Sequence, residues 1–178
     1  MLNGKKIVVS VTGCSPAMQA LNIISELKKH HADVYVVMTE NATNFVTPLM
    51  LQRSVDHPIQ IHAYDLPKTW DNSHTSLSQK TELLLIAPAS ANILGKAANG
   101  ISDDLLSTTI MSMRGPKVIA THINDMMYNS RSVLRNVQTL KNDGFIFVEN
   151  GNFEHPSHFP AIDRIINTVI QVLGHDDD

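Results

Sequence analysis

The sequence has only one cysteine, Cys14, in 178 residues. One cysteine cannot form an internal disulfide, and no cysteine and histidine pair has the spacing of a structural zinc site. We therefore expect a fold that is held together by its core, without a disulfide and without a bound metal. A chain with so little cysteine suits a reducing compartment, so the expected location is the cytoplasm.

The chain also lacks an excess of charge of one sign and any long apolar run. Its formal net charge is -3, and no stripe of lysine and arginine falls on an expected helix. This balance argues against a nucleic-acid partner. At the N-terminus a basic pair precedes only a handful of apolar residues, too few for a signal peptide or a membrane span. We expect no membrane partner either.

No internal repeat, low-complexity tract or linker divides the sequence. A chain of 178 residues has the length of one domain with a sizeable core. We predict a single domain over residues 1–174 and a disordered tail at 175–178, which reads HDDD.

Apolar runs and helix-period segments alternate along the chain. The apolar runs predict strands at 6–11, 33–38, 58–63, 83–87, 117–121 and 145–148. The segments between them predict helices at 17–29, 46–56, 93–99, 131–141 and 161–173, and one that begins at 103. This alternation is typical of an α/β fold, here a single-domain Rossmann-like (flavodoxin-like) three-layer sandwich with a mainly parallel sheet of about six strands.

The rest of the chain is organised around one stretch, in which a buried strand ends before Pro88 and a helix follows. Small residues lie between them, Ala89, Ser90 and Ala91, and then Asn92. In an open α/β sheet, ligands bind beyond the carboxyl ends of the strands, and small side chains let a ligand touch the backbone. The stretch indicates a binding site, and a tight turn that serves packing alone is the alternative.

Polar residues follow three other strands. Gly13 and Ser15 lie in the loop after the first strand, but TGCSP lacks the G-x-G-x-x-G fingerprint, so a dinucleotide is not the favoured ligand. Thr39 follows the second strand, where its hydroxyl can meet a phosphate or cap the next helix. Asn124 follows the strand at 117–121, where its amide can reach the same crevice or cap a helix.

His74 stands ahead of the central strand, at the expected start of a short helix. It follows a polar segment at 64–73 that carries Trp70, the only tryptophan. Taken alone, one of nine histidines is more often a solvated or packing residue than a catalytic one. Its position ahead of the central strand makes it a candidate acid or base.

Five motifs occur in a fixed order along the sequence. They are VVMTENATNFVTP after the second strand, His74, PASAN at 88–92, ANGISDDLLSTT at 98–109 and HINDMMYN at 122–129. With these motifs, nearly the whole chain resembles the family of homo-oligomeric flavin-containing cysteine decarboxylases. That family includes phosphopantothenoylcysteine decarboxylase and the peptidyl-cysteine decarboxylases of lantibiotic biosynthesis, for epidermin and mersacidin. HINDMMYN is similar to the family motif P-A-M-N-x-x-M-W.

The resemblance implies a bound FMN and a homo-oligomer, a trimer or a dodecamer built from trimers. The residues that would hold FMN are Gly13, Ser15, Thr39, Phe45, Pro88, Ala89, Ser90 and Ala91. His74 would be the active-site base, and Asn124 would bind the substrate carboxylate. The further residues that would contact the substrate are Asn92, Met127 and Phe153.

FMN supplies the electron sink that decarboxylation of a cysteine needs. Oxidation of the thiol-bearing carbon to a thioaldehyde lets the electron pair left behind by carbon dioxide delocalise into the carbon-sulfur double bond, which gives an enethiol. An imidazole suits the accompanying proton transfer near neutral pH. A neutral amide orients the carboxylate without a positive charge that would oppose its loss.

The sequence departs from the family in two places. The pantothenate enzymes have an A-C-G-D motif after the last strand, whose cysteine helps to return electrons from the reduced flavin to the decarboxylated intermediate, whereas the segment 149–160 has no cysteine. Its NFEHPS is instead similar to the S-F-E-I-S pattern in the substrate clamp of the epidermin enzyme. Thr121, His122 and Ile123 replace the usual residues before the motif's asparagine, and Tyr128 replaces its tryptophan.

We therefore expect oxidative decarboxylation of a cysteine-terminated peptide to an enethiol. The alternative enzyme is phosphopantothenoylcysteine decarboxylase of coenzyme A biosynthesis, which needs a reducing group. A non-enzyme alternative is a flavin-binding regulatory subunit of the halotolerance-protein type, and the presence of both His74 and Asn124 argues against it. A flavin prenyltransferase shares the architecture but lacks this pairing of histidine and asparagine.

Overall fold

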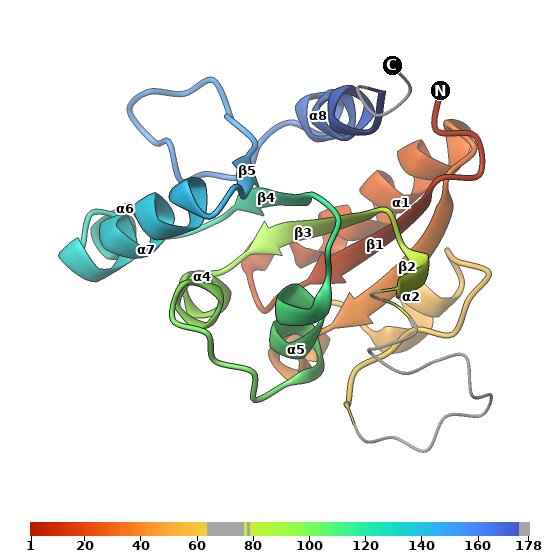
Figure 1. Cartoon of the computed structure of the whole chain (residues 1–178), viewed down its shortest axis with the longest axis horizontal. Coiled ribbons are helices and arrows are strands. Elements are labelled where there is room, and N and C mark those ends of the chain that lie inside the picture. Colours follow the sequence, from red (N-terminus) through yellow and green to blue (C-terminus); the bar gives the residue numbers. More distant parts are fainter. Residues whose placement is uncertain (64–76, 78, 175–178) are drawn as a thin grey trace.

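The computed structural model describes residues 1–63, 77 and 79–174. Within them a five-stranded sheet has the order β2-β1-β3-β4-β5 (Figure 1). Its strands are β1 (Lys6–Val11), β2 (Asp33–Met38), β3 (Leu83–Ala89), β4 (Lys117–Thr121) and β5 (Ile146–Phe147). All four strand pairs are parallel. The α/β architecture expected from the alternating pattern is confirmed.

The sheet has five strands rather than about six, because the expected strand at 58–63 does not form. Gln60 makes an isolated bridge with Val37 of β2, in which Gln60 N donates to Val36 O at 3.0 Å. A parallel ladder would need its next N–H donor two residues earlier, at position 58. Pro58 has no backbone N–H, so it cannot donate there. The segment therefore follows the edge of the sheet for a single bridge.

The central strand, β3, continues beyond its apolar run. The sequence predicts an end before Pro88, yet the strand extends to Ala89. Its pairing with β4 shifts in register between Ile86 and Ala89, and the peptide bond between Ala87 and Pro88 is cis. The strand is buried along its whole length, as expected for a central strand of a sheet that is covered on both faces.

Helices lie between the strands and cover both faces of the sheet. Within the described residues, the α-helices are α1 (Gln19–Lys29), α2 (Pro48–Gln52), α4 (Ala91–Ala98), α5 (Leu105–Ser112), α6 (Asp125–Tyr128), α7 (Arg131–Asn142) and α8 (Ile162–Gly174). Two 3₁₀ helices, η1 (Ser15–Met18) and η2 (Glu40–Asn44), follow β1 and β2. The helix expected at 46–56 is thus confined to the five residues of α2.

Each face of the sheet has its own apolar core, because successive side chains of a strand point to opposite faces. Val9 belongs to one core, together with Ile23 of α1 and Ile165 of α8. Val8 belongs to the other, together with Ile93 of α4 and with residues of α5 and α7. Figure 1 shows the resulting three layers, helices, sheet and helices.

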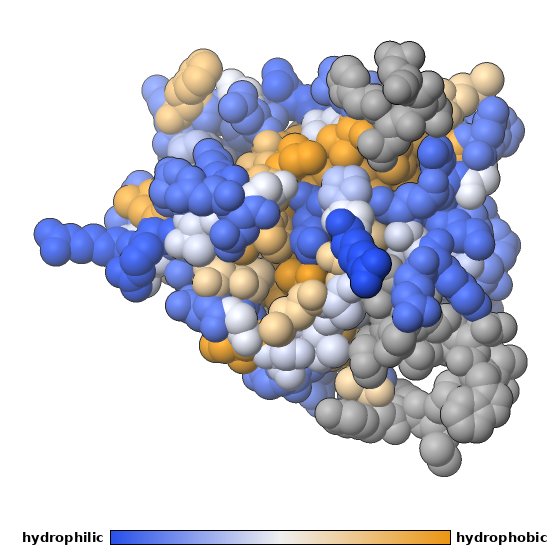
Figure 2. Space-filling view, in the orientation of Figure 1, coloured by the Kyte–Doolittle hydropathy of each residue, from blue (hydrophilic) through white to orange (hydrophobic). Residues whose placement is uncertain are grey.

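The face of the molecule drawn in Figure 2 is mainly polar. Figure 2 shows hydrophilic side chains over most of one face, with apolar side chains in patches between them. Such scattered apolar residues are normal on a globular protein. No helix among the described residues combines the length and the apolar character that crossing a membrane requires.

The strand order places a topological switch point between β1 and β3. From β1 the chain proceeds to β2 on one side, and from β3 it proceeds to β4 and β5 on the other. Open α/β sheets bind ligands beyond the carboxyl ends of their strands at such a point. The exits of β1 and β3 are therefore the first place to look for a site.

Candidate functional site

Hydrogen bonds tie together the exits of β1, β3 and β4. The hydroxyl of Thr12, which follows β1, donates to Pro88 O at 2.8 Å and accepts from Ser90 N at 3.0 Å. His122 N, directly after β4, donates to Ala89 O at 3.0 Å. The last residues of β3 and Ser90 therefore lie between the loop after β1 and the turn after β4.

The loop after β1 lies against the 3₁₀ helix after β2. A Cβ atom on Gly13 would be 2.8 Å from the Asn41 Cβ and 3.0 Å from its carbonyl carbon. Side chains do not approach backbone this closely, so only glycine allows the two loops to meet. Thr39 N also donates to Val11 O at 3.0 Å, which fixes the end of β2 beside the end of β1.

Thr39 presents a hydroxyl that the fold does not use. The residue occupies the N-cap position of η2, yet its side chain makes no capping hydrogen bond. Its Oγ1 atom is buried and has no hydrogen-bond partner among the described residues. A buried polar atom without a partner is costly, so the capping alternative does not explain this threonine. The hydroxyl fits a site where a polar ligand binds.

Two other buried side-chain atoms lack a partner among the described residues, and they lie at the same edge of the sheet. They are Ser10 Oγ, near the end of β1, and His122 Nδ1, directly after β4. Together with Thr39 Oγ1 they mark the carboxyl ends of three strands. A polar ligand in this crevice would supply the hydrogen-bond partners that these atoms need.

His122 joins the loop after β1 to the turn after β4. Its Nε2 lies 3.1 Å from the Oγ of Ser15, at the start of η1. Burial lowers the pKa of His122, and the nearby His158 lowers it further, so the imidazole is neutral at pH 7. Sequence reasoning treated this histidine only as a departure from a family motif. Its place directly after a buried strand was the signal that it lies at the crevice.

The small residues at the end of β3 and directly after it have a packing role as well as a place at the switch point. Pro88 and Ala89 are buried, and Ser90 caps α4 by accepting from Ile93 N at 3.4 Å. Asn92 is exposed in the first turn of α4. The packing alternative thus accounts for the serine, while the turn still borders the crevice between β1 and β3.

Asn124 caps a helix and retains its amide donors. Its Oδ1 accepts from Met126 N at 3.0 Å, the capping role that the sequence left open. An amide side chain has two N–H donors besides its oxygen, so this cap does not use the group that would bind a carboxylate. The capping bond instead orients the donors.

The remaining expected contacts are exposed side chains. Phe45 at the end of η2, Met127 of α6 and Phe153 after β5 expose 44%, 55% and 97% of their surface. Phe153 lines a cavity of about 200 Å³ with Tyr128 and Lys141. Tyr128 stands where the family motif has tryptophan, and burial raises the pKa of its phenol. Of the four residues expected to contact the substrate, only Phe153 lines this cavity, and the roles of Asn92, Asn124 and Met127 stay predictions.

Three expectations lie outside the described residues. They concern His74, the segment that carries Trp70, and the tail at 175–178. The role of His74 as a base and the disorder of the tail stay predictions.

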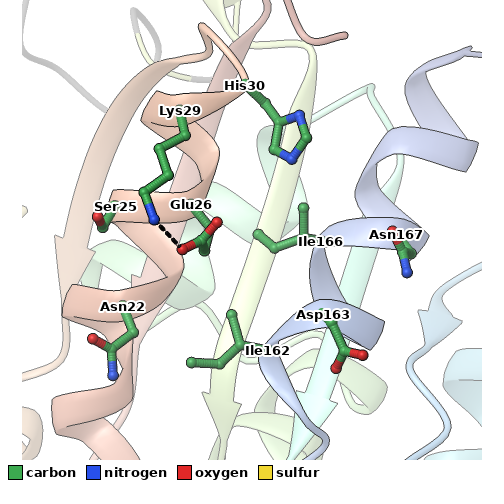
Figure 3. Close-up of a pocket in the computed structure, with 9 residues that line it drawn as sticks. All are labelled: Asn22, Ser25, Glu26, Lys29, His30, Ile162, Asp163, Ile166 and Asn167. Carbon is green, nitrogen blue, oxygen red and sulfur yellow. Dashed lines mark hydrogen bonds and ion pairs between the residues drawn. The ribbon is translucent and has the colours of Figure 1, made fainter.

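A second concave surface lies between α1 and α8 (Figure 3). Its volume is about 550 Å³, and polar side chains of α1 form part of its walls, with Lys29 Nζ 2.6 Å from a carboxylate oxygen of Glu26. Ile162 and Ile166 project into it from α8. None of the expected site residues lines it, so the carboxyl edge of the sheet is the candidate site.

Comparison with known proteins identifies the class. The family model described as Flavoprotein matches residues 1–174. The chain therefore belongs to the flavoprotein family, and the family resemblance drawn from the five motifs is confirmed.

Solved structures with the same fold include two cysteine decarboxylases. One is the FMN-dependent cysteine decarboxylase SpaF, with a TM-score of 0.84, 29% identity and coverage of 97% of this chain and 99% of SpaF. The other is the peptidyl-cysteine decarboxylase EpiD, with a TM-score of 0.80, 26% identity and coverage of 94% of this chain and 99% of EpiD.

The curated relatives include a longer protein. The coenzyme A biosynthesis bifunctional protein CoaBC of Bacillus subtilis (strain 168) is 36% identical over 149 residues, which cover 84% of this chain and 37% of the relative. The chain thus matches little more than a third of that relative's length.

Proposed function

We propose that this protein is an FMN-dependent decarboxylase that acts on a cysteine carboxylate, with phosphopantothenoylcysteine as its substrate. The choice of substrate rests on sequence identity. The chain is 36% identical to the coenzyme A biosynthesis protein CoaBC, against 29% to SpaF and 26% to EpiD. This reverses the order of the two substrates expected from the sequence, because the motifs alone favour a peptide.

The residues at the carboxyl edge of the sheet suit FMN. Thr39 would bind its phosphate, which the unpartnered hydroxyl supports. The residues that would complete the site are Gly13, Ser15, Phe45, Pro88, Ala89, Ser90 and Ala91. When bound, FMN accepts two electrons from the thiol-bearing carbon of the substrate, so that the electron pair left by carbon dioxide is stabilised.

Neutral groups of this chain would position the reactants. Asn124 would orient the substrate carboxylate through its amide donors, without a positive charge that would hold the carboxylate in place. With its proton on Nε2, His122 donates to Ser15 and leaves the serine O–H for an anionic group. His74 would take up the proton that the oxidation releases.

The fate of the electrons favours the second candidate, oxidative decarboxylation of a cysteine-terminated peptide. A saturated product needs the two electrons of the reduced flavin to return to the intermediate, and the segment 149–160 has no cysteine to assist that transfer. Cys14 is the only thiol of the chain, and burial raises its pKa, so little of it is the reactive thiolate. Without such assistance the two electrons stay on the flavin, the product is an enethiol, and an electron acceptor outside the chain must reoxidise the flavin.

Product mass tests both candidates. The flavin-loaded protein is incubated with phosphopantothenoylcysteine and, separately, with cysteine-terminated peptides, and the products are analysed by mass spectrometry. Turnover of phosphopantothenoylcysteine alone is the expected result. Loss of carbon dioxide together with two hydrogens identifies an enethiol, and loss of carbon dioxide alone a saturated product. Turnover of the peptides alone would establish the second candidate, and turnover of neither substrate would refute a decarboxylase.

A further inference from the structure

Three side chains that can bind a metal meet beside Asn124. Asp125 begins α6, and His155 and His158 lie in the segment between β5 and α8. Their ligand atoms all lie within 4.8 Å of one another. We propose that this cluster binds one divalent cation of the zinc class. The proposal is independent of the decarboxylase function.

The donor set selects this class of cation. Two imidazole nitrogens and one carboxylate oxygen suit Zn²⁺ and its first-row neighbours, whereas Mg²⁺ and Ca²⁺ prefer oxygen ligands alone. The side chains of Asp125, His155 and His158 are 37%, 44% and 45% exposed, so a cation can reach them from solvent. Three protein ligands leave a fourth position of a tetrahedral site for water.

The distances fit a site that closes on the cation with a small movement. Metal bonds of about 2.0–2.1 Å place neighbouring ligand atoms of a tetrahedral site roughly 3.3–3.4 Å apart. His158 Nε2 and Asp125 Oδ1, at 3.5 Å, already have this separation. His155 Nδ1 and Asp125 Oδ2 are 2.6 Å apart, a hydrogen-bond distance. A cation would take the place of the hydrogen bond between these two atoms, and the neutral imidazole of His155 would then carry its one proton on Nε2.

Hydrogen bonds hold the two histidines in place without any metal. Asn150 Nδ2 donates to His155 O at 2.7 Å and to His158 O at 2.9 Å. His158 N donates to His155 O at 3.1 Å, which closes a turn. The two rings stack with their centroids 4.6 Å apart and their planes 6° from parallel. Little ordering therefore remains to be done when a cation binds.

The carboxylate is also held in place. The buried Ser157 donates from Oγ to Ile123 O at 2.8 Å and to Asp125 Oδ1 at 3.3 Å. Ile123 N in turn donates to Ser157 O at 3.1 Å. Hydrogen bonds of this kind orient the ligands of metal sites. A cation here would fasten the segment after β5 to the turn that carries Asn124.

A histidine and aspartate pair elsewhere in the chain provides an internal comparison. His57 Nε2 lies 2.6 Å from Asp33 Oδ1, the same separation as in the cluster. The ring stacked on His57, at 4.0 Å between centroids, is that of Tyr35, where the cluster has a second imidazole. The pair of His57 and Asp33 is therefore the matched control for the cluster, because it has the same hydrogen bond and a stacked ring but no second imidazole.

The test is zinc binding by the full-length, flavin-loaded protein without a histidine tag, after removal of metals with a chelator. Competition against a chromogenic zinc indicator should show one Zn²⁺ per chain. His158→Gln removes one ligand but keeps the contact between His155 and Asp125, so the fold should persist, as circular dichroism can check. Its zinc affinity should fall by at least about 10-fold, the lower bound for perturbing a metal site. His57→Gln should leave the affinity unchanged.

Two results would overturn the proposal. One is the absence of stoichiometric zinc binding, and the other is equal affinity in the wild type and in both the His158→Gln and His155→Gln variants, which would place the zinc elsewhere. Competition by millimolar Mg²⁺ as strong as by Co²⁺ would contradict the class of cation.

Discussion

At the scale of single residues, the clearest sign of a ligand site is a buried polar side-chain atom that has no hydrogen-bond partner among the described residues. Thr39 sits at an N-cap position but does not cap, and its hydroxyl is buried. Asn124 sits at a similar position and does cap, through the oxygen of its amide. The sequence allows either residue to cap a helix or to face a ligand. Only Asn124 caps, because the backbone at the end of each strand sets the direction of the side chain.

Thr39→Val tests the phosphate role. The substitution keeps the shape and removes a hydroxyl that has no partner among the described residues, so the flavin-free protein should be as stable as the wild type or up to about 1 kcal/mol more stable. FMN affinity, measured by quenching of flavin fluorescence, should fall roughly 10- to 100-fold, the range for a hydrogen bond to a charged group.

Thr43→Val is the control for Thr39→Val, because the Thr43 hydroxyl donates to Glu40 O at 2.7 Å within the same 3₁₀ helix. It should leave FMN affinity unchanged. Equal FMN affinity in Thr39→Val and in the wild type would rule out the phosphate contact.

Asn124→Asp tests the carboxylate contact. An aspartate can still accept from Met126 N and cap α6, but it has no N–H donor and carries a charge that repels a carboxylate. Decarboxylation should slow by about 100-fold in kcat/KM, a usual cost of misplacing a reactant. The flavin absorbance of the purified variant should be unchanged, and unaltered kcat/KM would refute the contact.

At the scale of elements, the motif ANGISDDLLSTT has a structural role. Asp104 caps α5 by accepting from Ser107 N at 2.7 Å, and its other oxygen pairs with Lys96 of α4 at 2.6 Å. Asp103 pairs with the same lysine at 2.7 Å but does not cap. Burial alone would raise the pKa of Asp104, but the hydrogen bonds from Lys96 and Ser107 outweigh it and hold that pKa below its usual value.

Asp104→Ala should lower the free energy of unfolding by about 1 kcal/mol or more at pH 7, because it removes the cap and an ion pair. The folded-state pKa of Asp104 is depressed, so its contribution is complete above the ordinary value of about 3.9 and is lost as the pH falls through the folded-state pKa. Urea unfolding at several pH values should show this acid-dependent loss in the wild type and a smaller one in the variant.

Asp103→Ala provides the comparison for Asp104→Ala. Its side chain is 59% exposed, so removing its ion pair should change stability by no more than about 0.5 kcal/mol. Equal destabilisation by the two variants would mean that the cap contributes nothing.

Strands with a long apolar run were predictable, and the segment that makes only a single bridge with β2 was not. The strands at 6–11 and 33–38 have the predicted bounds, because their continuous apolar runs are buried by helices on both faces. The segment 58–63 has the apolar residues of a strand, but a proline falls where the ladder needs a donor. The strand propensity of a segment does not show that one hydrogen bond of the ladder is missing, here the one that Pro58 cannot donate.

At the scale of the whole molecule, the fold brings the carboxyl ends of its strands together, and three buried polar atoms there have no partner within the described part of the chain. Ligand binding at this edge should therefore couple to global stability, since a ligand that binds only the folded chain stabilises it. The expected homo-oligomer and the cytoplasmic location stay predictions.

Thermal unfolding with added flavin measures this coupling. FMN at 100 times its dissociation constant should stabilise the protein by about 2.7 kcal/mol. Riboflavin at the same concentration should stabilise it less, because it lacks the phosphate that Thr39 would bind. Equal stabilisation by the two flavins would show that the site does not recognise the phosphate of FMN.

The sequence by itself determined the α/β class, the parallel strands and the family, because these depend on local periodicity and on motifs that are contiguous in the chain. Only the tertiary structure decided which polar atoms lack a partner among the described residues and which distant residues meet. It joins His122 to Ser15, and it brings Asp125 to two histidines 30 or more residues further along the chain. Such contacts arise because parallel strands end at one edge of the sheet, whatever the separation of those ends in the sequence.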